Sequence, residues 1–255
     1  MIILKSNSEL ELMREAGRLN ARILEAIRQA VRPGVTTMEL NNIAERMLDE
    51  AGARGVFKGY SFDGRMPPYP TAINACINEE LVHGIPKDDR CLKEGDLLTI
   101  DCGTEYHGYI GDSAISIGVG RVDPEVAHLI EVTEKALYIG IEQSRAGCRV
   151  GDIGAAIQGF VEGQGYNVVR GYGGHGVGRS MHEDPHVPNY GRPGRGTKLR
   201  RGMTFAIEPM VLQGDHEVVV LPDQWTVAAR DGRLTAHFEH TIAITDNGPE
   251  ILTQL

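Results

Sequence analysis

The sequence lacks the features that mark several common protein classes. Cysteine occurs only four times in 255 residues, and no two cysteines form a C-x-x-C pair. This scarcity argues against a disulfide framework or a zinc finger and predicts a protein of the reducing cytoplasm. No run approaches the roughly 18 apolar residues that a membrane span needs. The apolar start Met1–Leu4 is too short for a signal peptide. We therefore expect no membrane partner.

An excess of positive charge is missing too. Lysine and arginine number 26 against 35 aspartates and glutamates, so the net charge is −9. This balance argues against DNA or RNA as the main partner. The hydrophobic share of 41% and the charged share of 24% are those of a soluble globular protein. A chain of this length can form one large domain, so we expect a single domain over residues 1–255 and, by default, a monomer.

The sequence does contain strong helix signals in its first part. A capping box at Ser8 and Glu11 opens an amphipathic pattern that continues to Val31. A second capping box at Thr36 and Glu39 opens another helical pattern. Two helices joined by a short turn are therefore predicted before the first strands.

The same order of elements recurs later in the chain. Asp123-Pro124 is a good helix start, and a shorter helix follows after a turn that contains glycine. A shift of 113 positions places Gly34 on Gly147, and we interpret this as a weak internal repeat of helix, turn, helix and strands. The repeat predicts an α+β domain with two halves, about 1–120 and 121–255, and a site between them.

Two aspartates accompany the first predicted strands. An apolar run at 97–100 predicts a buried strand that ends at Asp101, and 109–119 predicts a second strand. A hairpin turn at His107-Gly108 would place Asp101 and Asp112 nearly opposite, on one face of the sheet. Two facing carboxylates repel each other unless a cation lies between them. A solvated pair at the hairpin end is the alternative, but the apolar run before Asp101 argues for burial.

Two glutamates lie in apolar strand sequence in the second half. Glu208 follows the run 203–207, and Glu239 lies in a strand predicted for 237–244. A buried glutamate without a partner is costly. One such residue could belong to an ion pair in the core. Two of them, together with two aspartates and a histidine, indicate a cation site.

The segment 171–190 combines glycines with two histidines seven residues apart, His175 and His182. Its glycines fit G-x-G-x-x-G, but two later prolines prevent the helix that a dinucleotide-binding loop must open. The sequence around Ser180 lacks the second glycine of a G-x-S-x-G hydrolase motif. A metal-binding or catalytic loop is the interpretation that these observations favour.

The metal hypothesis combines four carboxylates with one imidazole, from Asp101, Asp112, His175, Glu208 and Glu239. This oxygen-rich set suits Mn, Fe(II), Co or Zn in a reactive site better than a structural zinc, which prefers thiolates. The number of ligands favours two divalent ions, because carboxylates can bridge ions about 3.5–4 Å apart that activate a water between them. His83 and His182 could then donate hydrogen bonds to a substrate amide or to a developing oxyanion.

Several segments occur together in one order along the chain. They are Asn78-Glu79-Glu80-Leu81-Val82-His83-Gly84-Ile85-Pro86, Asp101 with Asp112, Gly174-His175-Gly176-Val177-Gly178-Arg179 with Met181-His182-Glu183, Ile207-Glu208-Pro209, Trp225-Thr226-Val227 and Phe238-Glu239-His240-Thr241. In these segments the chain resembles the type I methionine aminopeptidases, of the pita-bread (creatinase/aminopeptidase) family M24. The resemblance spans nearly the whole chain. It implies a pseudo-twofold α+β domain with a central antiparallel sheet covered by helices.

The resemblance also implies an activity and a ligand set. The activity would be that of a cytoplasmic, metal-dependent aminopeptidase, a hydrolase that removes the initiator methionine from nascent chains whose second residue is small. Asp112 and Glu239 would bridge two divalent ions. Asp101 would bind one ion, while His175 and Glu208 would bind the other.

The same resemblance implies roles around the scissile bond. Metal-bound hydroxide would attack the carbonyl carbon after the first residue, with Glu208 as the proton shuttle. His83 and His182 would contact the substrate around the scissile amide. One ion would hold the free α-amino group, which explains the removal of a single residue.

An apolar pocket for the methionine side chain is implied as well. Its residues would be Tyr60, Tyr69, Asn74, Met181 and Trp225. The chain departs from the family here, because Asn74 replaces the usual cysteine and Met181 the usual aromatic residue. The segment from Tyr60 to Tyr69 is also longer than is common. These departures affect the size of the pocket and leave the chemistry intact.

Two other functions stay open. An Xaa-Pro aminopeptidase or prolidase would share the five ligands, although those enzymes usually carry a separate N-terminal domain. Non-catalytic relatives that bind protein partners lack ligands that are present here. A basic cluster could in addition contact ribosomal RNA transiently, and a solvated loop is the simpler interpretation. The cluster consists of Arg192, Arg195, Lys198, Arg200 and Arg201.

Overall fold

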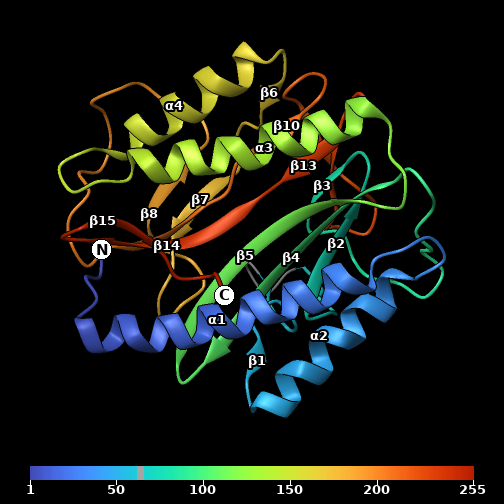
Figure 1. The fold of residues 1–255 in the computed structure, drawn as a ribbon, viewed down its shortest axis with the longest axis horizontal. Helices are drawn as coiled ribbons and strands as arrows, with labels where there is room; N and C mark the ends of the chain where they lie inside the picture. Colours follow the sequence, from blue (N-terminus) through green and yellow to red (C-terminus); the bar gives the residue numbers. More distant parts are fainter. Residues whose placement is uncertain (62–65) are drawn as a thin grey trace.

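The computed structural model describes residues 1–61 and 66–255, drawn as a ribbon in Figure 1. The described part contains four α-helices and fifteen β-strands. Part of the long segment predicted between Tyr60 and Tyr69, namely residues 62–65, lies outside the described residues. None of the helices in the described ranges has both the length and the apolar character required to cross a membrane.

The first two helices are α1 (Asn7–Ala30) and α2 (Thr37–Ala51). The capping box of α1 is formed by Ser6 and Glu9, so the prediction of Ser8 and Glu11 was wrong by two residues. Both pairs have the required spacing, but Glu11 is instead paired with Arg14 on the helix surface. The predicted cap of α2 is confirmed, since Glu39 donates its N–H to Thr36 Oγ1 at 3.1 Å.

The second helix pair consists of α3 (Pro124–Gln143) and α4 (Val150–Gly163). The last residues of α1 and α3, Ala30 and Gln143, are 113 positions apart, and so are the first residues of α2 and α4, Thr37 and Val150. The helices thus keep the spacing that the glycines indicated. The division of the domain at about residue 120 stays a prediction.

The longest hairpin is formed by β4 (Leu97–Tyr106) and β5 (Tyr109–Gly118). Its turn is His107-Gly108, as predicted, and both turn residues have positive φ. The strand does not end at Asp101 but continues for five residues. Asp101 is opposite Ala114 and Asp112 is opposite Gly103, so the two aspartates are two positions out of register. They still share one face of the sheet.

The strand predicted for 237–244 is divided at Phe238. β13 (Thr235–His237) pairs with β10 (Met210–Leu212), whereas β14 (Glu239–Thr245) pairs with β5 and with β9 (Thr204–Ile207). Glu208 lies between β9 and β10, and Glu239 is the first residue of β14. Both glutamates therefore lie where the chain leaves one sheet for another, and this change of sheet brings them together.

The remaining strands complete three sheets. They are β1 (Arg54–Gly55), β2 (Ile73–Ile77), β3 (Glu80–Val82), β6 (Asn167–Val168), β7 (Gly173–Gly176), β8 (Glu183–Pro188), β11 (Val218–Val220), β12 (Val227–Ala229) and β15 (Gly248–Ile251). The main sheet has the order β1-β4-β5-β14-β9-β7-β8, with β2 on β4 and β15 on β14, and its pairs are antiparallel. β13-β10-β6 and β11-β12-β3 form two small sheets.

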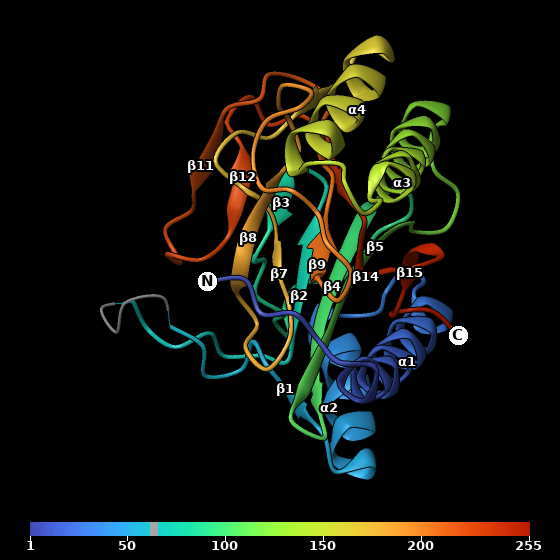
Figure 2. The ribbon, with the colours of Figure 1, turned by 90° about the vertical axis from the view of Figure 1, so that its left-hand side faces the viewer.

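The four helices lie on one side of the main sheet, and the sheet β11-β12-β3 lies on the other (Figure 2). One core cluster joins α3 and α4 to β9 and β14, through residues such as Ile157, Phe205 and Ile242. Another joins α1 and α2 to β2 and β4, through Leu40 and Ile100 among others. The predicted α+β class, with a central antiparallel sheet covered by helices, is confirmed.

Candidate metal centre

Every residue that the sequence suggested for the site lines one cavity of about 330 Å³. The candidate ligands there are Asp101, Asp112, His175, Glu208 and Glu239, and the candidate substrate contacts are Tyr60, Tyr69, Asn74, His83, Met181, His182 and Trp225. The wall also contains side chains that the sequence did not single out, namely Phe57, Val82, Tyr172, His186, Met210 and His237. The cavity therefore collects residues from before and after residue 120.

Asp112, His175 and Glu239 form the tightest group of possible ligands. Each offers one ligand atom within 4.8 Å of the other two. His175 Nε2 lies 3.8 Å from Asp112 Oδ2 and 3.6 Å from Glu208 Oε1, distances too long for hydrogen bonds. His175 Nδ1 donates to the carbonyl oxygen of Gly176 at 3.1 Å, so the lone pair of Nε2 faces the carboxylates. This orientation suits a metal ligand.

Four largely buried carboxylates lie together here. Burial, opposed by a hydrogen bond from Asn74, raises the pKa of Asp101 to about 7. Burial and then the charge of Asp101 raise the pKa of Glu208 to about 8. Burial and neighbouring carboxylates also raise the pKa values of Asp112 and Glu239 well above their ordinary ranges. Within residues 1–61 and 66–255, no cationic side chain contributes to these pKa shifts, so the ionised cluster lacks a compensating positive charge there.

The buried oxygens of this cluster show whether a cation would fit. Asp101 Oδ1, Asp112 Oδ1 and Glu239 Oε1 have no hydrogen-bond partner among the residues that the structure describes. Buried carboxylate oxygens are ordinarily paired, because an unpaired one keeps its full desolvation cost. Divalent cations would satisfy all three at once. The donor set, oxygen-rich with one imidazole, fits such ions.

The backbone and one neighbour hold the aspartates in place. Asn74 on β2 is directly opposite Asp101 on β4, and its Nδ2 donates to Asp101 Oδ2 at 2.7 Å. The other Asp101 oxygen is left for a cation. The N–H of Asp112 donates to Thr241 Oγ1 at 3.0 Å, and Thr241 Oγ1 donates to the carbonyl oxygen of Asp112 at 2.8 Å. The Asp101 carboxylate and the Asp112 backbone are therefore anchored before any ion binds.

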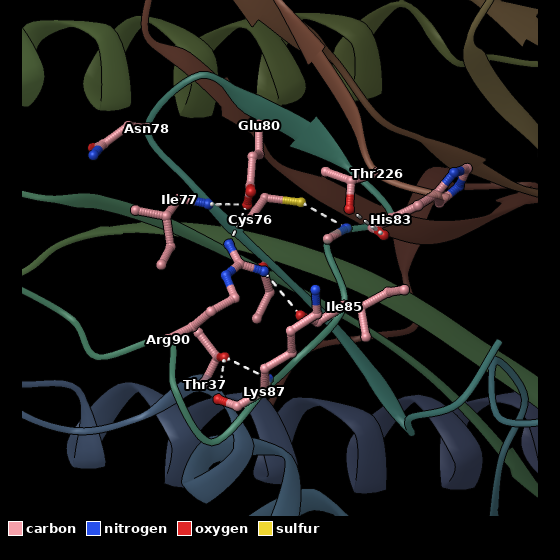
Figure 3. A network of polar contacts seen from close by, with 12 residues as sticks. Thr37, Cys76, Ile77, Asn78, Glu80, His83, Ile85, Lys87, Arg90 and Thr226 are labelled. Carbon is pink, nitrogen blue, oxygen red and sulfur yellow. Dashed lines mark hydrogen bonds and ion pairs between the residues drawn. The ribbon is translucent and has the colours of Figure 1, made fainter. Parts of the chain in front are cut away.

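His83 reaches the cavity from a strained position after β3. Its φ is +61°, in the left-handed region that few residues other than glycine adopt. Figure 3 shows contacts that hold this turn. Thr226 Oγ1 donates to the carbonyl oxygen of His83 at 3.5 Å, and the N–H of Gly84 donates to Cys76 Sγ at 3.2 Å. Tyr69 donates its hydroxyl to the carbonyl oxygen of Gly84 at 2.8 Å.

A half-buried arginine completes the network below that turn (Figure 3). Arg90 donates to the carbonyl oxygens of Ile85 at 2.9 Å and Ala75 at 3.3 Å, and it pairs with Glu80. Glu80 Oε2 also accepts the N–H of Ile77 at 2.9 Å. The segment from β2 to the end of the His83 turn is thus fixed by charge-assisted hydrogen bonds.

The second histidine lies at the rim of the cavity. His182 is exposed, and its ring centre is 4.3 Å from that of His175. Tyr60 Oη lies 3.1 Å from His182 Nδ1, so the two residues share a hydrogen bond. Burial and then His182 lower the pKa of His83 to about 4, and burial lowers the pKa of His182. Both imidazoles are therefore neutral at pH 7 and can each donate one N–H.

The apolar wall is built mainly by aromatic side chains. Tyr69 and Trp225 are buried and meet edge to face, with ring centroids 5.2 Å apart. Trp225 donates its indole N–H to the carbonyl oxygen of Pro67 at 3.0 Å. Met181 is half-buried and belongs to the same apolar cluster. The wall is therefore preformed around a space for an apolar side chain.

The sequence reasoning gave no role to His237. This side chain is 2% exposed, and its Nε2 lies 3.8 Å from Glu208 Oε2 and 3.9 Å from Glu239 Oε2. Burial lowers its pKa to about 3, so it is neutral. A signal was available, because residues two apart on an extended chain face the same way and Glu239 was already a candidate.

A family model, curated sequences and solved structures all match this chain to the same family. Residues 11–246 match the model of metallopeptidase family M24. A methionine aminopeptidase from Clostridium acetobutylicum is 48% identical over 253 residues, which is 99% of each chain. The crystal structure of methionine aminopeptidase from Thermotoga maritima superimposes with a TM-score of 0.96 at 45% identity and covers 100% of both chains.

A more distant likeness concerns the fold alone. The prolidase from Pyrococcus horikoshii OT3 has a TM-score of 0.78 at 23% identity, and the match covers 100% of this chain but 64% of the prolidase. The pita-bread architecture expected from the sequence is thereby confirmed. At this identity the likeness shows a shared fold and no more.

Proposed function

This chain belongs to metallopeptidase family M24, and from that premise we propose that it is a methionine aminopeptidase, which removes the N-terminal methionine of other polypeptides. The observation that carries this proposal is the end-to-end match to enzymes of that name, with the whole site included. The cavity agrees, because the acidic ligands and the apolar wall that line it together would accept a methionine residue with a free amino group.

We assign the cation-binding role to Asp101, Asp112, His175, Glu208 and Glu239, and expect two divalent ions such as Co, Mn, Fe(II) or Zn. When bound, such ions would supply Lewis-acid activation of a water and of the scissile carbonyl. The protein's own contribution is to hold the ligands in a largely buried cavity. Asn74 donates to the Asp101 carboxylate, and Thr241 holds the backbone of Asp112.

We assign substrate contacts to the neutral histidines. Each of His83 and His182 would donate one N–H to the peptide group on either side of the scissile bond. Glu208 would take a proton from the attacking water and deliver it to the leaving amine, because its carboxyl is 12% exposed and opens on the cavity. Tyr60, Tyr69, Asn74, Met181 and Trp225 would surround the methionine side chain.

We further propose that residues 1–255 act as one catalytic domain, with halves of about 1–120 and 121–255. The enzyme would work as a monomer in the cytoplasm on nascent polypeptides.

The basic cluster of Arg192, Arg195, Lys198, Arg200 and Arg201 is exposed, which is compatible with a transient ribosome contact. Charge reversal at these five positions would abolish co-sedimentation with ribosomes if that contact exists.

The activity is tested by peptide cleavage after the metal-free protein is titrated with each metal. Met-Ala-Ser should lose its methionine, and Ala-Pro-Gly should stay intact. Preference for Ala-Pro-Gly would replace the proposal by an Xaa-Pro aminopeptidase or prolidase activity. Cleavage of neither peptide, together with no bound transition metal by elemental analysis, would indicate a non-catalytic relative that binds peptides.

A further inference from the structure

His237 is a buried polar side chain beside the carboxylates that has no role in the function proposed above. Neither Nδ1 nor Nε2 has a hydrogen-bond partner within residues 1–61 and 66–255. An unsatisfied buried polar group costs about 1–3 kcal/mol, so a leucine here would be cheaper in a site without ions. An imidazole at this position therefore needs an explanation in terms of what it faces.

The imidazole faces two of the candidate ligands. Nε2 lies 3.8 Å from Glu208 Oε2 and 3.9 Å from Glu239 Oε2. A hydrogen bond to either carboxylate requires an approach of about 1 Å. The two glutamates lie on separate segments, one after β9 and one at the start of β14. A single N–H between them can fix the orientation of both carboxylates.

The backbone of His237 is held unusually well for such a role. Ser116 Oγ on β5 accepts the N–H of His237 at 2.9 Å and donates to its carbonyl oxygen at 2.9 Å. Thr99 Oγ1 lies 2.8 Å from the same hydroxyl and can donate to it. His237 is also paired with Met210 on β10. The backbone of His237 is thus fixed. The approach that a hydrogen bond requires must therefore come mainly from movement of the glutamate side chains.

We propose that His237 is a positioning residue for the metal centre, with Nε2–H donating to the outer carboxylate oxygens of Glu208 and Glu239. This inference rests on the proposed metallopeptidase function. A neutral donor suits the place, since lysine or arginine would add a charge that repels the cations. Hydrogen bonds to the outer oxygens of ligating carboxylates orient them and typically change metal affinity 10–100-fold.

The test measures metal affinity on folded, metal-free protein without any substrate. H237L removes the donor, H237M is a second apolar variant in case H237L does not fold, and H237Q keeps an N–H donor of similar reach. Isothermal titration with Mn²⁺ or Co²⁺ should show binding that is about 10–100-fold weaker in H237L or H237M. H237Q should recover most of the affinity. Circular dichroism and thermal unfolding confirm that each variant is folded.

Two outcomes would overturn the inference. Unchanged affinity in the folded apolar variants would show that His237 does not orient the ligands. Binding in H237Q that is as weak as in H237L, with an altered visible spectrum of bound Co²⁺, would show that the imidazole is a ligand itself. Failure of the wild-type protein to cleave Met-Ala-Ser would reject the proposed function while these metal affinities stayed interpretable.

Discussion

Two polar regions support the cavity, one half-buried and one buried, and they differ in how their charged groups are paired. Around β3 and the His83 turn, Arg90 and Glu80 pair with each other and with backbone groups (Figure 3). Among the candidate metal ligands, one carboxylate oxygen each of Asp101, Asp112 and Glu239 has no hydrogen-bond partner within the described ranges. A network of paired groups makes a fold rigid. Unpaired buried oxygens instead carry a desolvation penalty, which a bound ligand can remove. The difference identifies scaffold and binding site without reference to any relative.

The largest expected effect comes from the unpaired region. Asp112→Asn keeps the shape of the side chain and removes its charge. Because Lewis-acid activation is worth several kcal/mol, cleavage of Met-Ala-Ser should fall by about 10³-fold or more. The metal-free variant should keep or gain thermal stability at pH 8, since burial and neighbouring carboxylates penalise the charge that is removed.

The predicted effect of Asp112→Asn on stability is tested by thermal unfolding of metal-free and metal-loaded protein. The gap between the two melting temperatures should shrink in Asp112→Asn, because the amide binds cations poorly. A metal-free variant that is clearly less stable than the wild type would mean that Asp112 is a structural residue. The contrast between the two regions would then fail.

Arg90→Met tests the paired region. It should lower the stability of the protein, whereas Asp112→Asn should keep or raise the stability of the metal-free protein. Removing one partner leaves Glu80 partly buried without its cation, so the free energy of unfolding should fall by about 2–3 kcal/mol. Arg54→Met is the matched control, because its pair with Glu105 is exposed and should cost less than about 1 kcal/mol. Urea unfolding of both variants gives the comparison.

Arg90→Met should also disturb catalysis indirectly. The turn that holds His83 in its left-handed conformation loses the hydrogen bond from Arg90 to the carbonyl oxygen of Ile85. The position of His83 should therefore shift, and KM and kcat should both change. Metal affinity should stay the same. Equal losses of stability in Arg90→Met and Arg54→Met would show that burial of the first pair contributes nothing.

Much of this arrangement is predictable from the sequence, for identifiable reasons. Capping boxes are local, so the helices were placed to within two or three residues, although Ser6 was missed in favour of Ser8. The two aspartates were placed on one face because a two-residue turn leaves little freedom of register. The position of the strand end was wrong, because Asp101 was taken as a stop signal although polar residues inside a ligand-binding strand are not stops.

Tertiary features explain what the sequence could not provide. The break at Phe238 depends on where β13 and β14 join different sheets, which no local pattern encodes. The hydrogen bond from Asn74 to Asp101 depends on the pairing of β2 with β4 across 27 positions. His237 was overlooked because one histidine in an apolar strand is usually a core residue. Its significance appears only beside Glu208.

The smallest expected effect is the pH dependence of the metal-free protein. The folded-state pKa values of Asp101, about 7, and Glu208, about 8, lie above the ordinary values of 3.8 and 4.5. A folded protein that holds protons which the unfolded chain has released loses stability as the pH rises through these values. The buried histidines act in the opposite direction up to about pH 7.5, because the unfolded chain still protonates them there while their folded-state pKa values are lowered.

The interval from pH 7.5 to 9 therefore reports mainly on the carboxylates. Urea unfolding of metal-free protein should show a loss of about 0.5–1 kcal/mol across it, in proportion to the protons that Asp101 and Glu208 release. Protein saturated with Mn²⁺ should show little of this loss, because bound cations keep the carboxylates ionised throughout. A metal-free protein whose stability is flat from pH 7.5 to 9 would mean that burial does not keep protons on Asp101 and Glu208.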